Sequence, residues 1–390
     1  MVEATMQAIF LLGYAAFEQA HSLPEFVREA AHCIMVCRTS ALGGHIQSCP
    51  DGHFHRIWYN SCKHRMCPLC AFLQVQRWLV KQKARIVRCD HYHVIFTMPE
   101  KLRFLWKSNT TLMTQIMFES ARDTLFELLG DKEYLGAKPG IIATLHTWSK
   151  TLLLHLHIHC LVTGGGLTKL GEWISVTNGY LLPFAVARDL FRGKVKHALE
   201  KALEKGDLVL PQGMRSQQLK NLLNKLGRKK WNVKICEKYS HGNGVLTYLA
   251  RYLRGGPISN SRIIKIEDGK VTFNYGREKV ELMTLSIGEF IERFLQHIPL
   301  PNSILVRSYG IYAHTKKDEL QRCREILGQG PLGETEFLDW QSCFEHSEDH
   351  PDLCPVCGKR LICTGVLPPD RVGRCSADPP PIEASCVKAA

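Results

Sequence analysis

Apolar residues recur at helical spacing along several parts of the chain, and short runs of β-forming residues separate these parts. The spacing predicts helices over residues 1–35, 71–88, 102–129, 245–253 and 287–297. The β-rich runs predict strands over residues 91–98, around 146 and 155, near 263 and 271, and over 304–312. No repeat with a period of about 20–50 residues interrupts this mixture of helices and strands.

The length of 390 residues suggests about two or three domains and allows a substantial hydrophobic core. A composition of 45% hydrophobic and 22% charged residues excludes a disordered or fibrous chain. The longest apolar run, from Ala8 to Phe17, falls well short of the ~20 residues that a membrane helix needs. The N-terminus also lacks the basic region of a signal peptide. We therefore expect a soluble, cytoplasmic protein.

Basic residues outnumber acidic residues by 50 to 37, which gives a net charge of +13 and a pI near 9.0. This excess favours a polyanionic partner, although a protein can be basic without having one. One basic stretch runs from Arg215 to Lys234, and in it Arg228, Lys229 and Lys230 precede Trp231. We expect a groove for nucleic-acid phosphates there, with Trp231 able to stack on a base, and a solvated helix face is the alternative.

Cysteine is unusually frequent and unevenly distributed. Of the 16 cysteines, seven lie between Cys33 and Cys89, and six lie between Cys343 and Cys386. Because a reducing cytosol disfavours disulfides, clustered cysteines with nearby histidines predict metal sites, with zinc as the default ion. Cys33 and Cys37 stand apart from the tightest spacings and are expected to be buried core thiols.

The remaining N-terminal cysteines predict a zinc site built from two short-spaced pairs. Cys67 and Cys70 form one knuckle, Cys49 and His53 can form the other, and Cys62 is a fifth candidate. The alternative is that these cysteines are all core residues. A closed site of four protein ligands leaves no position for substrate, so we expect it to support folding and nucleic-acid contact.

The C-terminal tail contains a further Cys-x2-Cys knuckle, Cys354 and Cys357, of the kind found in zinc ribbons. Cys363 and Cys375 are candidate partners for a second zinc ion. The alternative is a set of free thiols in a loosely ordered tail.

Three histidines, His155, His157 and His159, alternate with aliphatic residues in a predicted strand. Alternate residues of a strand share one face, so the three imidazoles point to the same side. His157 and His159 can present two nitrogens to one divalent metal, with His146 as our candidate third ligand and His155 as the alternative. A surface or core role for all three is the less favoured interpretation. The similar His-Tyr-His run at 91–93 is expected to be a structural strand.

Tyr248 and Tyr252 lie four residues apart in a predicted helix, so their phenols share one helical face. Such a pair usually packs in a core. Here it follows a glycine-rich approach and a histidine strand, and Arg251 lies between the tyrosines. A phenol can attack a phosphodiester and form a phosphotyrosine, and a divalent metal can offset the charge that develops. Two tyrosines allow two successive strand transfers without a nucleotide cofactor.

Taken together, these residues resemble the two-tyrosine HUH transposases of rolling-circle bacterial insertion sequences, over most of the chain. The matching segments are Asn60 to Cys70, His91 to Pro99, Leu145 to Trp148, His157 to Gly166, Tyr248 to Tyr252, Ile258 to Ile263 and Arg307 to Gly310. One departure concerns the first zinc knuckle, which is Cys-x2-Cys in many members. In this chain His53 follows Cys49 where the second cysteine is expected.

The resemblance implies an α+β fold in which an HUH-endonuclease core, an antiparallel sheet flanked by helices, follows a helical and zinc-binding module. We expect a zinc-binding, DNA-contacting domain over residues 1–90, the HUH nuclease domain over 91–320 and a cysteine-rich tail over 321–390. In the core, the histidine strand would face the tyrosine helix.

The resemblance also implies a role for each matching residue. Tyr248 and Tyr252 would be the nucleophiles, and His157 and His159 would bind Mg²⁺ or Mn²⁺. The structural Zn²⁺ would be held by cysteines, namely Cys49, Cys62, Cys67 and Cys70.

We therefore expect a bacterial, nucleoid-associated transposase that nicks single-stranded DNA at the ends of its element and joins it to target DNA through 5′-phosphotyrosine intermediates. The expected DNA contacts are Arg228, Lys229, Lys230 and Arg251. A replication initiator or relaxase would share this chemistry, and a non-enzymatic zinc-ribbon DNA-binding protein is the alternative from another class. A zinc hydrolase is a poorer option, because no acidic residue accompanies the histidine motif at a suitable short spacing.

Overall fold

The structure, a computed structural model, describes residues 4–177, 179–239, 243–250, 256–276, 279–333 and 351–370. Its centre is an antiparallel sheet with the strand order β11-β4-β5-β3-β7, and β6 pairs with the C-terminal end of β5. These strands span Val306–Gly310 (β11), Lys138–Trp148 (β4), Leu154–Leu167 (β5), His91–Thr97 (β3), Val233–Tyr239 (β7) and Trp173–Ser175 (β6). The histidine strand β5 is therefore the middle strand.

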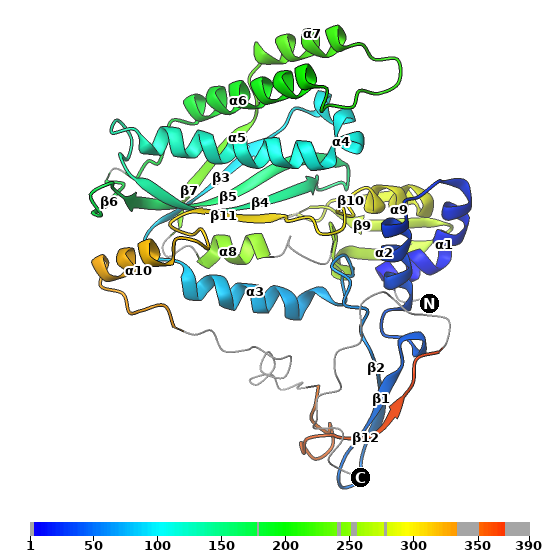
Figure 1. Cartoon of the computed structure of the whole chain (residues 1–390). Coiled ribbons are helices and arrows are strands. Elements are labelled where there is room, and N and C mark those ends of the chain that lie inside the picture. The colour runs from blue at the N-terminus through cyan, green and yellow to red at the C-terminus, as the bar shows by residue number, and fades with distance from the viewer. Residues whose placement is uncertain are drawn as a thin grey trace.

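Helices cover both faces of this sheet (Figure 1). On one face lie α4 (Phe104–Ser108), α5 (Thr110–Gly130), α6 (Phe184–Lys205) and α7 (Ser216–Gly227), and on the other α3 (Ala71–Arg85) and α8 (Asn243–Ala250). Successive side chains of β5 point to opposite faces of the sheet and therefore pack against different helices. Leu156 and Ile158 are buried in the core beneath α5, whereas Leu161 is buried in a separate core with Leu246 and Leu249 of α8. The odd-numbered residues of β5 thus face α8.

A second unit combines the N-terminus with a segment from much later in the chain. Helices α1 (Met6–Ala20) and α2 (Glu25–Val36) share a core with β8 (Ile263–Glu267), β9 (Lys270–Asn274), β10 (Leu282–Ser286) and α9 (Ile287–Leu295). The ring of Phe10 packs edge-on against Phe294 at a centroid distance of 5.5 Å. At the start of α9 the hydroxyl of Ser286 accepts a hydrogen bond from the Glu289 amide, which caps the helix.

A separate sheet pairs an early segment of the chain with a late one. It has the order β12-β1-β2, with β1 over Gly44–Ser48, β2 over His55–Tyr59 and β12 over Ile362–Leu367, all antiparallel. The helix α10 (Lys317–Ile326) packs beside α3, and short 3₁₀ turns cover Ser40–Leu42, Glu100–Leu102 and Asn260–Arg262.

The α+β architecture predicted from the sequence is confirmed. The helical region expected over residues 1–35 consists of two helices, and the second starts after Pro24, as its Pro-Glu sequence indicates. The packing crosses the boundary expected between residues 1–90 and 91–320. Helix α3, from the first range, packs on the central sheet, whereas residues 263–295, from the second range, pack with α1 and α2. Among the described residues, no helix is both long and apolar enough to cross a bilayer.

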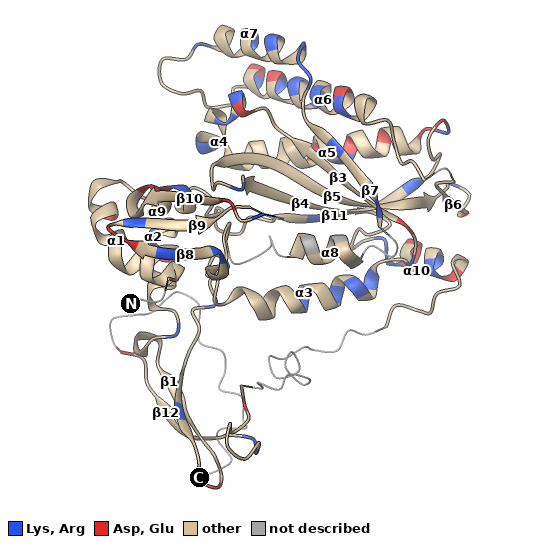
Figure 2. Ribbon diagram, turned by 180° about the vertical axis from the view of Figure 1, so that it is seen from behind, with Lys and Arg blue, Asp and Glu red and all other residues tan. Residues whose placement is uncertain are grey.

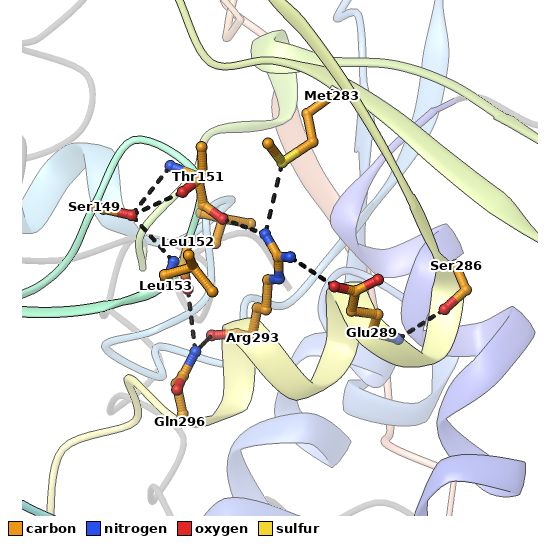
Figure 3. Close-up of polar contacts among 9 residues, drawn as sticks. All are labelled: Ser149, Thr151, Leu152, Leu153, Met283, Ser286, Glu289, Arg293 and Gln296. Atoms are coloured by element: carbon orange, nitrogen blue, oxygen red, sulfur yellow. Dashed lines mark hydrogen bonds and ion pairs between the residues drawn. The ribbon is translucent and has the colours of Figure 1, made fainter. Parts of the chain in front are cut away.

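The loop between β4 and β5 is anchored in the second unit (Figure 3). Leu152 at its tip is completely buried in the core of that unit and adopts a φ of 64°, which a leucine rarely does. Arg293 of α9 donates a hydrogen bond to the Thr151 carbonyl at 2.8 Å, and Gln296 donates one to the Leu152 carbonyl at 3.1 Å. Burial and these bonds offset the backbone strain and hold the hairpin that carries the histidines.

His297 completes this anchor. Its Nε2 donates to the Leu152 carbonyl at 2.9 Å, and its Nδ1 accepts from the Thr147 hydroxyl at 3.1 Å. The imidazole is buried, and burial lowers its pKa to about 4, against which the bond to Leu152 acts weakly. His297 is therefore neutral at physiological pH.

This burial predicts a loss of stability in mild acid. Because the pKa of His297 is lower in the folded than in the unfolded chain, the unfolded chain takes up the proton first as the pH falls below about 6.5. Between pH 7 and pH 5 the free energy of unfolding should fall by about 2 kcal/mol from this residue alone. Urea unfolding of the wild type and of His297→Gln at both pH values measures it. The variant should lose less stability than the wild type, and equal losses would contradict the assignment.

Candidate functional site

The register of β4 and β5 brings three histidines together. His146 pairs with His157 across the two strands, and His159 lies two residues further along β5, opposite Thr144. The candidate ligand atoms of His146, His157 and His159 all lie within 4.8 Å of one another. His146 and His159 are buried and His157 is half-buried, so the cluster opens toward solvent on the His157 side.

His155, the alternative third ligand, is not in this cluster. Its ring lies beside that of His157 at a centroid distance of 5.0 Å, on the side away from His159. Its backbone carbonyl instead accepts a hydrogen bond from His157 Nδ1 at 2.7 Å. This bond keeps the proton on Nδ1, so Nε2 is the His157 nitrogen suited to a metal.

Further side chains support the cluster. His93 of β3 is buried, and its Nε2 lies 2.7 Å from Nδ1 of His159. Trp148 stacks on His146 with the rings 8° from parallel. The expectation of a purely structural strand at 91–93 holds for His91, which contacts the Tyr312 hydroxyl, but it missed His93. Its position on the odd-numbered face of β3 was the available signal.

The tyrosine helix packs on the same face of the sheet as the histidines. Leu246 and Leu249 of α8 share a core with Ile142 of β4 and Leu161 of β5. Tyr248 belongs to α8, but its side chain and the whole of Arg251 and Tyr252 lie outside the described residues.

Four thiols form a cluster at the junction of α2 and α3. They are Cys37, Cys62, Cys67 and Cys70, and all four sulfurs lie within 4.8 Å of one another. Cys37 Sγ is 3.4 Å from Cys70 Sγ, and Cys62 Sγ is 3.6 Å from it. Hydrogen bonds among the four thiols lower the pKa of Cys37 and Cys70 and raise the pKa of Cys62 and Cys67. Four sulfur donors fit a structural zinc ion.

Cys37 is a buried core thiol, as expected, but the sequence did not predict that the end of α2 also brings it beside the Cys67–Cys70 knuckle and into the four-thiol cluster. Cys33 is buried in the core as expected. The pairing of Cys49 and His53 with the Cys67 knuckle was wrong, since both residues lie in the turn between β1 and β2 and outside the four-thiol cluster.

Cys49 and His53 instead meet the C-terminal knuckle. The donor atoms of Cys49, His53, Cys354 and Cys357 lie within 4.8 Å of one another. Of the partners expected for that knuckle, Cys363 lies on β12 outside the cluster, with its sulfur against the Gly365 carbonyl, and Cys375 lies outside the described residues.

Of the basic residues expected to bind DNA, Arg251 lies outside the described residues, and the stretch that begins at Arg228 lies away from the histidines. Arg228 and Lys229 border a hollow beside α7, on the opposite side of the sheet from α8. Trp231 is buried, donates to the Leu226 carbonyl at 3.1 Å and packs edge-on against Phe191, so the expectation that it stacks on a base was wrong.

Comparison with known proteins identifies two families along the chain. Residues 9–98 match a family described as "Transposase zinc-binding domain", and residues 140–319 match one described as "Putative transposase". The chain is 34% identical over 383 residues to "Putative transposase y4qJ" of Sinorhizobium fredii, which covers 92% of this chain and 95% of that protein. It is 28% identical to the transposase for insertion sequence element IS801 of Pseudomonas savastanoi pv. phaseolicola, over 86% of this chain and 82% of that protein.

Solved structures of the conjugative relaxase TrwC with oriT DNA share 11–13% identity with this chain. They cover 41% of it and 70–71% of the relaxase chain, with TM-scores of 0.23–0.24. The sequence relatives, by contrast, extend across nearly the whole molecule. The chain therefore belongs to the two-tyrosine HUH transposases of IS91-type rolling-circle insertion sequences, with an N-terminal zinc-binding domain.

Proposed function

We propose that this transposase cleaves and rejoins single-stranded DNA with Tyr248 and Tyr252 as nucleophiles, beside a divalent cation held by His146, His157 and His159. The observation that supports the proposal is the shared face of the sheet. The three clustered histidines lie on the side against which the helix of Tyr248 packs. A phosphodiester bound there would meet both the cation and the phenols.

The chemistry is a pair of transesterifications. The first phenol oxygen attacks the phosphorus, an O–P bond forms, and the bond from phosphorus to the 3′ oxygen breaks. The phenol loses its proton as it attacks and the leaving 3′ oxygen takes one up, so protons balance and the products are a 5′-phosphotyrosine and a free 3′-OH. The second tyrosine holds the other strand end during transfer. Each step exchanges one phosphodiester for another, so no nucleotide is consumed.

A divalent cation on the three imidazoles would polarise a non-bridging phosphate oxygen and offset the charge that develops on it. An all-imidazole set suits Mn²⁺ better than Mg²⁺, because Mg²⁺ prefers oxygen ligands. Mn²⁺ is therefore the first cation to use in an assay.

DNA would reach the site along the α3 side of the sheet. Lys81 and Arg85 of α3 line a hollow with His314 and with Lys317 at the start of α10, and Figure 2 shows basic residues on the half of α3 that is nearer to α10. Arg251, next to Tyr252, would add a charge at the cleaved phosphate. Arg228, Lys229 and Lys230 on the far face would contact more distant DNA.

The nucleophile assignment predicts a covalent adduct. Single-stranded oligonucleotides that cover the DNA flanking the gene, incubated with protein and Mn²⁺, should give a denaturation-resistant protein–DNA band. The double variant Tyr248→Phe/Tyr252→Phe should abolish the band, because phenylalanine has no oxygen to attack phosphorus. The gel also assigns the order of attack through the two single variants.

Tyr239→Phe provides the matched control. Tyr239 is an exposed tyrosine of the neighbouring strand β7, so its substitution should leave the band unchanged. An adduct that survives the double variant would show that another residue is the nucleophile. A wild-type protein that binds the oligonucleotides without forming any adduct would contradict the proposal itself.

The contact between His93 and His159 predicts a weaker cation site in His93→Ala. Loss of a partner that orients a metal-binding histidine lowers metal affinity by about 10–100-fold. Titration of Mn²⁺ by electron paramagnetic resonance measures the affinity directly, and cleavage at saturating Mn²⁺ should recover most of its rate. In His93→Gln the side-chain amide can still form a hydrogen bond with Nδ1 of His159, so this variant should keep more of the Mn²⁺ affinity than His93→Ala.

Two further variants bracket this result. His146→Ala should remove the site, and His155→Asn should change the affinity by less than about twofold, since its carbonyl contact to His157 remains. If His155→Asn weakens Mn²⁺ binding as much as His146→Ala, the third ligand is misassigned.

A further inference from the structure

We propose that Cys49, His53, Cys354 and Cys357 bind a second zinc ion, which ties the C-terminal segment to the N-terminal zinc-binding domain. The two halves of the site are about 300 residues apart in the sequence. On this proposal the zinc-binding domain is complete only when both halves are present.

Each half of the site is a tight turn that presents two donors. In the first, the Cys49 amide donates to the Phe54 carbonyl at 2.8 Å and Gly52 takes a φ of +76°. In the second, the Cys354 amide donates to the Lys359 carbonyl at 2.8 Å and Gly358 takes a φ of +69°. Two such knuckles are the usual source of the four ligands of a structural zinc ion.

The two knuckles meet at donor distance. Cys49 Sγ lies 3.5 Å from Cys357 Sγ and 3.8 Å from His53 Nδ1. Three sulfurs and one imidazole nitrogen form a Cys₃His set, which binds zinc in a tetrahedron with no open position. The site is therefore structural.

Polar contacts align the segment around the site. Gln47 of β1 donates to the buried Asp352 carboxylate at 3.3 Å, and Arg56 of β2 donates to both Gln47 and the Pro351 carbonyl. Lys359 forms an ion pair with Asp51 at 2.8 Å, which joins the two knuckles directly. These contacts bring β12 into register beside β1.

Apolar packing alone is too small to hold this segment. Among the residues that the structure describes, the core around the knuckles contains three buried residues, Cys49, Cys354 and Leu361, with Phe54 and Cys357 packed against them. Modules with so little buried surface depend on a metal ion for folding. Residues 351–370 lie outside both family matches. On this proposal their role is to supply half of the second zinc site.

Zinc content tests the proposal. Full-length protein should lose one equivalent of zinc in Cys354→Ser and in His53→Ala, and should keep it in His53→Cys, because a thiolate can replace the imidazole. Cys363→Ser is the matched control and should keep all zinc, since Cys363 lies outside the cluster. Unchanged zinc in Cys354→Ser would overturn the proposal.

Cobalt substitution separates the two cysteine clusters even if a variant is less stable. The cluster of Cys37, Cys62, Cys67 and Cys70 has four sulfur donors, and the second has three sulfurs and one nitrogen, so their d–d spectra differ. Cys354→Ser should remove only the S₃N component. Removal of the S₄ component as well would show that the clusters are not separate sites.

Hydrogen exchange tests the structural consequence. Amides of β12, residues 362–367, should exchange at least about tenfold faster in Cys354→Ser than in Cys363→Ser, because β12 then detaches from β1. Equal protection would contradict the role of zinc as a tie. None of these measurements uses DNA, so their outcome is independent of the tyrosine chemistry.

Discussion

The antiparallel pairing of β4 with β5 is the contact on which the site depends. Its register sets His146 opposite His157, and the pleat turns His159 to the same side. A shift by one residue would send every histidine of β5 into the apolar core beneath α5. Two separate cores keep this register in place. Leu156 and Ile158 are buried in the core beneath α5, and Leu152 at the loop tip is buried in the core of the second unit.

The same loop physically links the central sheet to the second unit. Leu152, held by Arg293, Gln296 and His297, inserts the end of the histidine hairpin into the unit formed by α1, α2 and α9. The four-thiol cluster belongs to the same core and leads directly into α3, which covers the tyrosine helix. Zinc binding at these thiols would therefore stabilise the orientation of the catalytic sheet as well as its own domain.

Local patterns predicted much of this arrangement. Period-two histidines, the tyrosine pair and the Cys67–Cys70 knuckle were recognisable because each depends on spacing within a few residues. Helix α6 and strands β1, β2 and β12 were missed, since short or mixed polar runs carry weak periodicity. Sequence spacing also misled the choice of zinc ligands, because it associated Cys49 with its nearest neighbours rather than with Cys354.

The sequence by itself thus determined the chemistry that the chain carries: imidazoles that alternate along a strand, two tyrosines four residues apart, and thiols in short-spaced knuckles. Tertiary structure decided the partners, joining His146 rather than His155 to the histidine pair, Cys37 to one thiol cluster, and the C-terminal knuckle to Cys49 and His53. The physical reason is range. Periodicity follows from bonded geometry over a few residues, whereas a ligand set forms between segments that only the packing of distant strands and helices brings together.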